Sequence, residues 1–374
     1  MKKPIIAGLL AGLLAGLLTL SGCSSMLERS YRSSTAHVDY SVSEDSTGLQ
    51  AETYQGLVNS ILYFISEHAT SGTIRLYNYT GDVEADLANA VDEVLNKDPL
   101  GAYAVRSLDC DSTRILTYYE VSLRIVYAHS AEDISAIRSV SGISALRQEL
   151  SKLVSEARAR TVLRVSYFSG DTQYIEQLFR LALFSNPVVN ILSVVPVTIS
   201  VYPETGSQRI VEINVSWPGS TELSNHARRL SEEHSALLEA TPPAGETYTV
   251  DELAAMLRAR VPSCDEGGSS SALAALSGET VNETGLLMAM EYLCQQSGIE
   301  TSAVIGMEGD SLWLIVSTPD GYRHLLPRWL RPDAELPDGE TLPLYTDEEL
   351  LSMGYVWSQS LHPVCAEYSG LSRE

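Results

Sequence analysis

The sequence predicts an α+β protein with two tandem α-β-α-β-β sandwich units followed by a separate C-terminal α+β domain. Three observations carry this prediction. A pattern recurs after about 88 residues, each copy ends in a segment of alternating hydrophobicity, and the proline-containing segment 241–245 breaks the helical spacing. We therefore expect units at residues 51–140 and 141–240, and the C-terminal domain at residues 249–374.

The N-terminus has the pattern of a bacterial lipoprotein signal. Two lysines precede an apolar run over residues 5–20, and Gly22 and Cys23 follow shortly after it. This resembles the lipobox, at which signal peptidase II removes residues 1–22 so that Cys23 becomes the lipidated first residue. We therefore expect a lipid-anchored protein at the extracytoplasmic face of the bacterial membrane. A single spanning helix is the alternative, because the run approaches the roughly 20 residues that a bilayer requires.

Acidic residues far outnumber basic ones, 48 against 25, for a formal charge of −23. Removal of Lys2 and Lys3 with the signal would leave 23 basic residues against the 48 acidic ones, a formal charge of −25. Such a surface repels nucleic-acid phosphates and anionic lipid head groups. We therefore exclude nucleic acid as a partner, and we expect the lipid at Cys23 to hold the protein at the membrane.

Four cysteines remain once Cys23 is acylated: Cys110, Cys264, Cys294 and Cys365. Their spacing forms no Cys-x-x-Cys pair and no Cys/His ligand pattern, so we expect neither a metal nor a cofactor. An extracytoplasmic location permits disulfides. Three pairings are compatible with the sequence, and so are four free thiols.

Residues 23–50 are rich in Ser, Thr and charge, and they have no helical or strand period. This composition favours a flexible tether between the lipid and the folded part of the chain. We expect ordered structure to begin near Ala51.

The two expected units match each other over a strand and the turn after it. Residues 73–79 recur as residues 161–167, and a Gly-Asp pair follows each segment. Glycine suits the turn, and Asp82 and Asp171 are placed to cap the next helix. A ligand-binding loop used twice is the alternative interpretation of these pairs.

In each unit an amphipathic helix precedes this strand, and a second helix and a hairpin follow it. The second helix should end before Asp98-Pro99 in one unit and Asn186-Pro187 in the other. Helical spacing over residues 222–238 adds a final helix to the second unit. The last strands alternate, and we expect these residues to face inward: Tyr119, Val121, Leu123, Ile125 and Tyr127, then Val211, Ile213, Val215 and Trp217.

The C-terminal domain is expected to contain a helix followed by three strands. An apolar stripe marks a helix that ends near Gly298-Ile299. A strand over residues 302–306 comes next, and a hairpin follows whose strands cover residues 311–316 and 322–326.

This order of elements resembles the core of the transglutaminase-like (papain-like) superfamily, in which a helix ending in Gly-Ile leads into a strand and a tryptophan-bearing hairpin. The matching positions are Gly298, Ile299, Trp313, Asp320, Gly321 and His324. Residues 345–365 also resemble the C-terminal stretch of some bacterial transglutaminase-like lipoproteins, chiefly from Gram-positive organisms. The resemblance implies an α+β fold for the C-terminal part alone and says nothing of the repeated units.

Active members of that family use a Cys, a His and an Asp. The helix dipole and the imidazolium favour the thiolate, and the Asp orients the imidazole. Alignment on Gly298 and Trp313 places Glu283, Ser311 and Leu326 at these three positions. None of them can replace the chemistry of its counterpart. The resemblance therefore implies a domain that keeps the scaffold and lacks the activity.

Glu283 has two interpretations. A carboxylate in the first turn of a helix is stabilised by the helix dipole, by about 0.3–1 kcal/mol at an exposed site, which is a structural role. Alternatively, Glu283 is a hydrogen-bond acceptor on the floor of a surviving cleft, walled by Trp313 and Ser311. His324 faces that same cleft or is a satisfied histidine of the surface or core.

We expect a non-catalytic lipoprotein that binds a peptide, a cell-wall component or an envelope protein. One alternative is a hydrolase of unfamiliar mechanism that uses Glu283 as acid or base. Another is the solute-binding lipoprotein of a transporter. The tandem copies argue against the latter, because solute-binding proteins usually pass the chain back and forth between two lobes.

The lipobox yields a direct test of the anchor. Cells that express the protein should incorporate a fatty-acid analogue into it, and Cys23→Ala should abolish the labelling and leave an unprocessed precursor. Cys110→Ala serves as the control, because that cysteine should carry no lipid. A wild-type protein that takes up no label would contradict the anchor.

Overall fold

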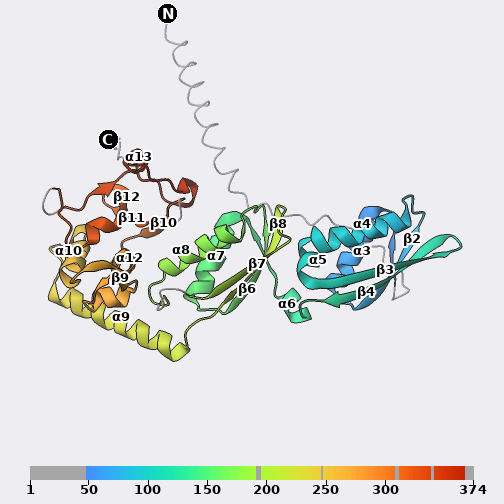
Figure 1. Ribbon diagram of the computed structural model, residues 1–374, viewed down its shortest axis with the longest axis horizontal. Helices are drawn as coiled ribbons and strands as arrows, with labels where there is room; N and C mark the ends of the chain where they lie inside the picture. The colour runs from blue at the N-terminus through green and yellow to red at the C-terminus, as the bar shows by residue number, and fades with distance from the viewer. Residues whose placement is uncertain (1–47, 191–194, 246, 308–310, 338–340, 367–374) are drawn as a thin grey trace, which may run out of the picture.

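A computed structural model describes five segments of the chain: residues 48–190, 195–245, 247–307, 311–337 and 341–366 (Figure 1). Within these residues the protein is a mixed α+β structure with eleven α-helices and three four-stranded sheets. The expected signal, Cys23 and most of the expected tether lie outside the described residues. Among the described helices, none combines the length and the apolarity needed to cross a bilayer.

The first sheet has the strand order β1-β2-β4-β3, and helices cover one of its faces (Figure 1). β1 and β2 are parallel, and the other neighbours are antiparallel. Leu57, Ile61, Ile74 and Val121 lie fully buried between the helices and the sheet. The elements are, in chain order, β1 (Gly48–Ala51), α3 (Tyr54–Ser66), β2 (Ser71–Tyr77), α4 (Val83–Asn96), α5 (Pro99–Ala104), β3 (Val105–Ile115) and β4 (Tyr118–Tyr127).

The second sheet has the order β5-β6-β8-β7, again with one parallel pair at an edge. Leu146, Leu150, Val165 and Ile213 form its core with α7 and α8. The elements are the connecting helix α6 (Ala131–Ser135), then β5 (Arg138–Ser141), α7 (Gly142–Ser155), β6 (Arg160–Ser166), α8 (Thr172–Phe184), β7 (Val197–Tyr202) and β8 (Gln208–Val215).

The expected α-β-α-β-β order is incomplete in both units, because a short strand precedes the first helix. β1 and β5 each pair in parallel with the strand that follows them. No residue of β5 is buried, and β1 buries only Ala51. Four residues with so little burial carry no alternating pattern, so the sequence could not predict these strands.

Asp98 and Pro99, which we expected only to end a helix, also begin the short helix α5. The Asp98 carboxylate accepts hydrogen bonds from the backbone N–H groups of Leu100 at 2.8 Å and Gly101 at 3.0 Å. Proline fits the first helical position, because the N–H that it lacks would have no partner there.

The two Gly-Asp pairs cap helices, as expected. Asp82 accepts hydrogen bonds from the backbone N–H groups of Glu84 and Ala85, both at 3.2 Å. Asp171 accepts one from the N–H of Tyr174 at 2.8 Å. The capping role is thus confirmed for both aspartates.

The second sheet is covered on both faces. Its helices α7 and α8 pack on one face, where Val211 and Ile213 belong to the second core. On the other face Val162 and Ile210 pack with the core of the first unit. β8 therefore departs from simple alternation, because Glu212 is buried along with the apolar residues on either side of it.

Arg160 contacts three elements, β8, α5 and α6, at the junction where the first unit meets the second sheet. Its Nε donates to the Glu212 carboxylate at 2.8 Å, its Nη2 donates to the Tyr103 hydroxyl at 3.1 Å, and it forms an ion pair with Asp133. The side chain of Glu212 is only 10% exposed, so its charge depends on this partner. Hydrogen bonding to Arg160 lowers the pKa of Asp133 to about 2.

The C-terminal part has an antiparallel sheet of order β10-β11-β12-β13 and the almost wholly buried helix α12. Gly298 follows α12 with φ +75°, a left-handed conformation that glycine adopts without strain. The elements are α9 (Ser220–Ala240), α10 (Val250–Arg260), β9 (Cys264–Ser269), α11 (Ala272–Leu276), α12 (Glu283–Gln296), β10 (Thr301–Ile305), β11 (Leu312–Thr318), β12 (Gly321–Leu325), η1 (Pro327–Leu330), β13 (Leu344–Tyr345), α13 (Asp347–Ser352) and η2 (Gln359–Leu361).

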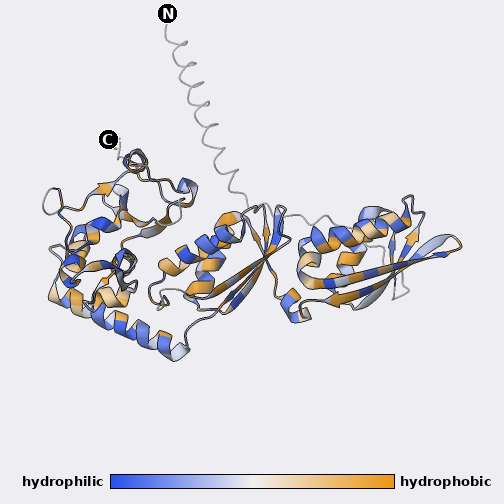
Figure 2. Ribbon diagram, in the orientation of Figure 1, coloured by the Kyte–Doolittle hydropathy of each residue, from blue (hydrophilic) through white to orange (hydrophobic). Residues whose placement is uncertain are grey.

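Helix α9, which we expected in the second unit, packs mainly with the C-terminal part. Leu230 belongs to the C-terminal core, and Leu237 and Leu238 lie against it. One contact joins α9 to the second unit: Nε2 of His226 lies 3.1 Å from the carbonyl oxygen of Pro187. Figure 2 shows that most of α9 is hydrophilic, so its pattern predicts a helix but not the partner of its narrow apolar side.

Removal of the Arg160 side chain from this junction should lower the stability of the fold. Arg160→Ala should lower the free energy of unfolding by about 2 kcal/mol, because hydrogen bonds to a charged group are lost and Glu212 stays buried. Urea unfolding measures this change. Arg228→Ala is the control: its ion pair with Glu232 is exposed, so about 0.5 kcal/mol or less is expected.

The same interaction predicts a pH dependence. The pKa of Asp133 is depressed in the folded state, so its contribution is present above the unfolded pKa of about 3.9 and is lost as the pH falls towards 2. The difference in stability between wild type and Arg160→Ala should therefore shrink between pH 5 and pH 2. A difference that is constant over this range would contradict the assignment.

Candidate functional site

The first of the three aligned triad positions, Glu283, lies at the start of α12. Asn282 caps this helix by accepting a hydrogen bond from the N–H of Gly285 at 3.0 Å. The Glu283 side chain is 49% exposed, and one of its carboxylate oxygens lies 3.8 Å from Nη1 of Arg331. This is the geometry of a solvated carboxylate at a helix N-terminus with a loosely held cationic neighbour.

The other two aligned positions differ in environment. Ser311 is exposed and directly follows residues 308–310, which lie outside the described part of the chain. Leu326 is 1% exposed and packs in an apolar cluster with Trp313 and Trp357. Within the described residues, no hydrogen bond or ion pair joins Glu283 to Ser311.

The structure brings Trp313 and His324 together, but it does not place them at the wall of an open cleft. Both side chains are fully buried. Nε1–H of Trp313 donates a hydrogen bond to Nδ1 of His324 at 2.9 Å. A cleft around Glu283, the alternative to a structural role, therefore cannot be walled by these two side chains, which belong to the interior, and His324 is a histidine of the core.

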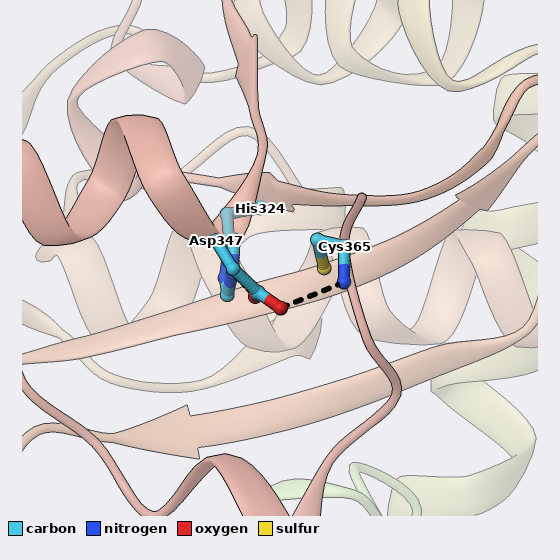
Figure 3. Close-up of side chains that lie close together, drawn as sticks. All are labelled: His324, Asp347 and Cys365. Atoms are coloured by element: carbon cyan, nitrogen blue, oxygen red, sulfur yellow. Dashed lines mark hydrogen bonds and ion pairs between the residues drawn. The ribbon is translucent and has the colours of Figure 1, made fainter. Parts of the chain in front are cut away.

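His324, Asp347 and Cys365 form a cluster in which the histidine and the cysteine are buried and the aspartate is partly exposed (Figure 3). It adjoins Trp313 through the hydrogen bond to His324. Nε2 of His324, on β12, is 2.8 Å from the Asp347 carboxylate at the start of α13. The other carboxylate oxygen of Asp347 accepts from the backbone N–H of Cys365 at 3.1 Å, and the Asp347 N–H donates to the Cys365 carbonyl at 2.7 Å. These hydrogen bonds hold the segment around Cys365 against the sheet.

The hydrogen bonds of His324 determine its tautomer. An indole N–H is only a donor, so Nδ1 of His324 must accept from Trp313 and cannot carry a proton. Nε2 then carries the proton and donates it to Asp347. Burial lowers the pKa of His324, and Asp347 opposes this effect only in part. The neutral ring has both nitrogens engaged and no free lone pair for proton abstraction.

The same argument weighs against a metal in this cluster. Its three side chains are donor types that zinc binds, and their ligand atoms lie within 4.8 Å of one another. Nε2 of His324 could bind a metal only if Nδ1 took the proton, which the Trp313 N–H prevents. Burial raises the pKa of Cys365 to about 12, so its sulfur is a thiol when no metal is bound. Metal binding would therefore require loss of both the Trp313–His324 hydrogen bond and the Cys365 proton.

The other described cysteines are also unsuited to nucleophilic chemistry. All four, Cys110, Cys264, Cys294 and Cys365, are free thiols. Burial raises the pKa of Cys110 to about 12, and it raises the pKa of Cys264 and Cys294 as well. A nucleophilic cysteine needs a lowered pKa, so none of these thiols is activated.

Sequence reasoning missed one unusual carboxyl group, Glu291. It is 1% exposed in α12, and its polar neighbours are Gln295, which donates a hydrogen bond at 2.8 Å, and the hydroxyl of Thr301. Burial raises the pKa of Glu291 to about 7. The available signal was an acid within the apolar run 286–294, because such a position is surrounded by core.

Comparisons of the chain with protein-family models and with curated proteins find no match. The transglutaminase-like resemblance therefore rests on the residues at the C-terminus and on their order along the chain.

Glu291 predicts how stability changes with pH. Its pKa is raised by folding, so the stability linked to it is fully present below about pH 4.3 and is lost as the pH rises through about 7. Glu291→Gln removes this titration and should be more stable than wild type at pH 8, by on the order of 2 kcal/mol. Thermal unfolding between pH 4.5 and 8 measures the effect.

Glu279→Gln is the matched control, because Glu279 is exposed just before the same helix. It should preserve the pH dependence of the wild type. Parallel stability curves for wild type and Glu291→Gln would show that Glu291 does not titrate in this range.

Proposed function

We propose that this protein is a lipid-anchored, extracytoplasmic lipoprotein with a non-catalytic transglutaminase-like domain. In this proposal it binds a peptide, a cell-wall component or another envelope protein. The lipobox at Cys23 supports the location, and the order of α12, β10, β11 and β12 supports the domain assignment. The formal charge of −23 supports a partner other than nucleic acid.

The observation that carries the proposal is the chemistry at the aligned triad positions. Glu283 is exposed beside Arg331, Ser311 is exposed, and Leu326 is part of the core. His324, which packs against Trp313 and Trp357 of this core, has both nitrogens in hydrogen bonds. A scaffold that holds these groups in place without a nucleophile or a free base is suited to binding and not to acyl transfer.

We further propose that residues 48–127 and 138–215 are copies of one unit. In both, a short strand is parallel to the next one, and the last two strands form an antiparallel hairpin. The strand orders β1-β2-β4-β3 and β5-β6-β8-β7 correspond position by position. The matched caps at Asp82 and Asp171 add support from the sequence.

The two alternatives receive less support. A hydrolase that uses Glu283 would need a second acid or base, and the charged partner of Glu283 is Arg331. A solute-binding lipoprotein would need two lobes crossed repeatedly by the chain, whereas here each sheet is completed before the next begins.

Activity measurements test the proposal. The purified protein should incorporate no amine and hydrolyse no peptide, and Cys264→Ser and Cys294→Ser should leave any binding intact. General acid–base assistance is typically worth about 10²–10⁴-fold, so turnover that depended on Glu283 would fall steeply in Glu283→Gln. That outcome would favour the hydrolase. Under the proposal, Glu283→Gln changes stability or affinity by about 1 kcal/mol at most.

A further inference from the structure

A polar pocket of about 390 Å³ lies where the second unit meets the C-terminal part. Its walls come from α7, α8 and the edge strand β10, and in Figure 1 α8 lies between α7 and the C-terminal part that contains β10. Two of these walls are single helix faces, because the lining residues of each helix follow the spacing i, i+3, i+4 and i+7. They are Ser144, Arg147, Gln148 and Ser151 on α7, and Leu178, Leu181, Ala182 and Ser185 on and just after α8.

Arg147 is the only charged residue among those that line this pocket. Within the described residues its guanidinium makes one hydrogen bond, from Nη1 to the Leu361 carbonyl at 2.5 Å, and it has no carboxylate partner. The neighbouring Arg138 and Arg158 differ, since both pair with Glu149. Partial burial lowers the pKa of Arg147, as expected where no acid compensates the charge. An uncompensated guanidinium in so acidic a protein indicates a site for an external anion.

The rest of the lining defines what kind of anion fits. Ser144, Gln148 and Ser151 extend the polar wall beyond Arg147. On β10 the Ser302 hydroxyl is already hydrogen-bonded to Nδ1 of His362 at 3.0 Å, and the Thr301 hydroxyl is bonded to Glu291. The third wall is apolar and consists of Leu178, Leu181 and Ala182. An inorganic anion would gain nothing from this wall. A ligand with a carboxylate at one end and a small apolar group beside it would use all three walls.

We infer that this pocket binds the carboxyl-terminal end of a peptide whose last residue is small and apolar. The carboxylate pairs with Arg147, the terminal side chain packs on Leu178 and Ala182, and the preceding backbone contacts the polar side chains of α7. A volume near the lower end of the usual range for ligand pockets limits the bound segment to the last residue or two. The inference rests on the proposed binding function and specifies its ligand.

Calorimetric titration of the purified full-length protein tests the inference. The probe is N-acetyl-alanyl-alanine with a free carboxylate, and the same dipeptide as its C-terminal amide is the matched ligand. Loss of a charge-assisted contact should weaken binding of the amide by about 10- to 100-fold. Inorganic phosphate should not displace the acid.

Three variants locate the site. Arg147→Gln should weaken binding of the acid by a similar factor, about 10- to 100-fold, and Arg147→Lys should lose less because it keeps the charge without the planar fork. Arg180→Gln, an exposed arginine on α8, should bind like the wild type. A thermal melt of each variant checks that the fold is retained. The comparison of the acid with the amide uses only the wild-type protein, so it does not depend on the folding of any variant.

The inference is overturned if acid and amide bind equally, if Arg147→Gln binds the acid as tightly as wild type, or if the acid does not bind at millimolar concentration. Displacement of the acid by phosphate would also overturn it, because the pocket would then hold a simple anion. Hydrolysis of the dipeptide would contradict the non-catalytic function while leaving the binding site intact. If the protein neither binds nor hydrolyses the dipeptide, the inferred site is wrong and the proposed function is unaffected.

Discussion

The hydrogen-bond chain from Trp313 through His324 to Asp347 is the constraint on which the C-terminal part depends. These polar groups lie within an apolar cluster, and each has a partner. Loss of one partner would leave a buried polar group unpaired, at a cost of about 1–3 kcal/mol. The chain also joins segments distant in sequence, because Asp347 holds the backbone of Cys365 while His324 lies on the central part of the sheet.

These hydrogen bonds give a cysteine, a histidine and an aspartate that lie close together a geometry unlike that of a catalytic triad. A triad needs an imidazole nitrogen with a lone pair directed at the nucleophile, and the indole of Trp313 has fixed the opposite tautomer. Burial keeps the Cys365 thiol protonated. The directions of the hydrogen bonds and the protonated thiol together distinguish this cluster from a triad.

The sequence predicted the elements that carry strong periodicity or caps. The α12 helix and the β11–β12 hairpin lie where expected, and Asp82 and Asp171 cap their helices. It could not predict β5, which buries no residue, or the packing of α9 through Leu230. The sequence left a cleft and a core role open for His324 and offered Trp313 as a possible cleft wall. The burial of both depends on Trp357 and Cys365, whose approach is a tertiary event without a local pattern. Arg147 gave no signal either, because a missing ion-pair partner is visible only in three dimensions.

The two-sided burial of β8 has a consequence for evolution. In the first unit Ser122 and Arg124 on the outer face of the sheet are exposed, whereas the corresponding face of the second sheet presents Val162 and Ile210 to its neighbour. The two units, although alike in strand order, should therefore differ in how well this face tolerates polar substitutions. A lineage that lost the first unit would expose this apolar face to water, and polar substitutions at these two positions would be the expected mark of that loss.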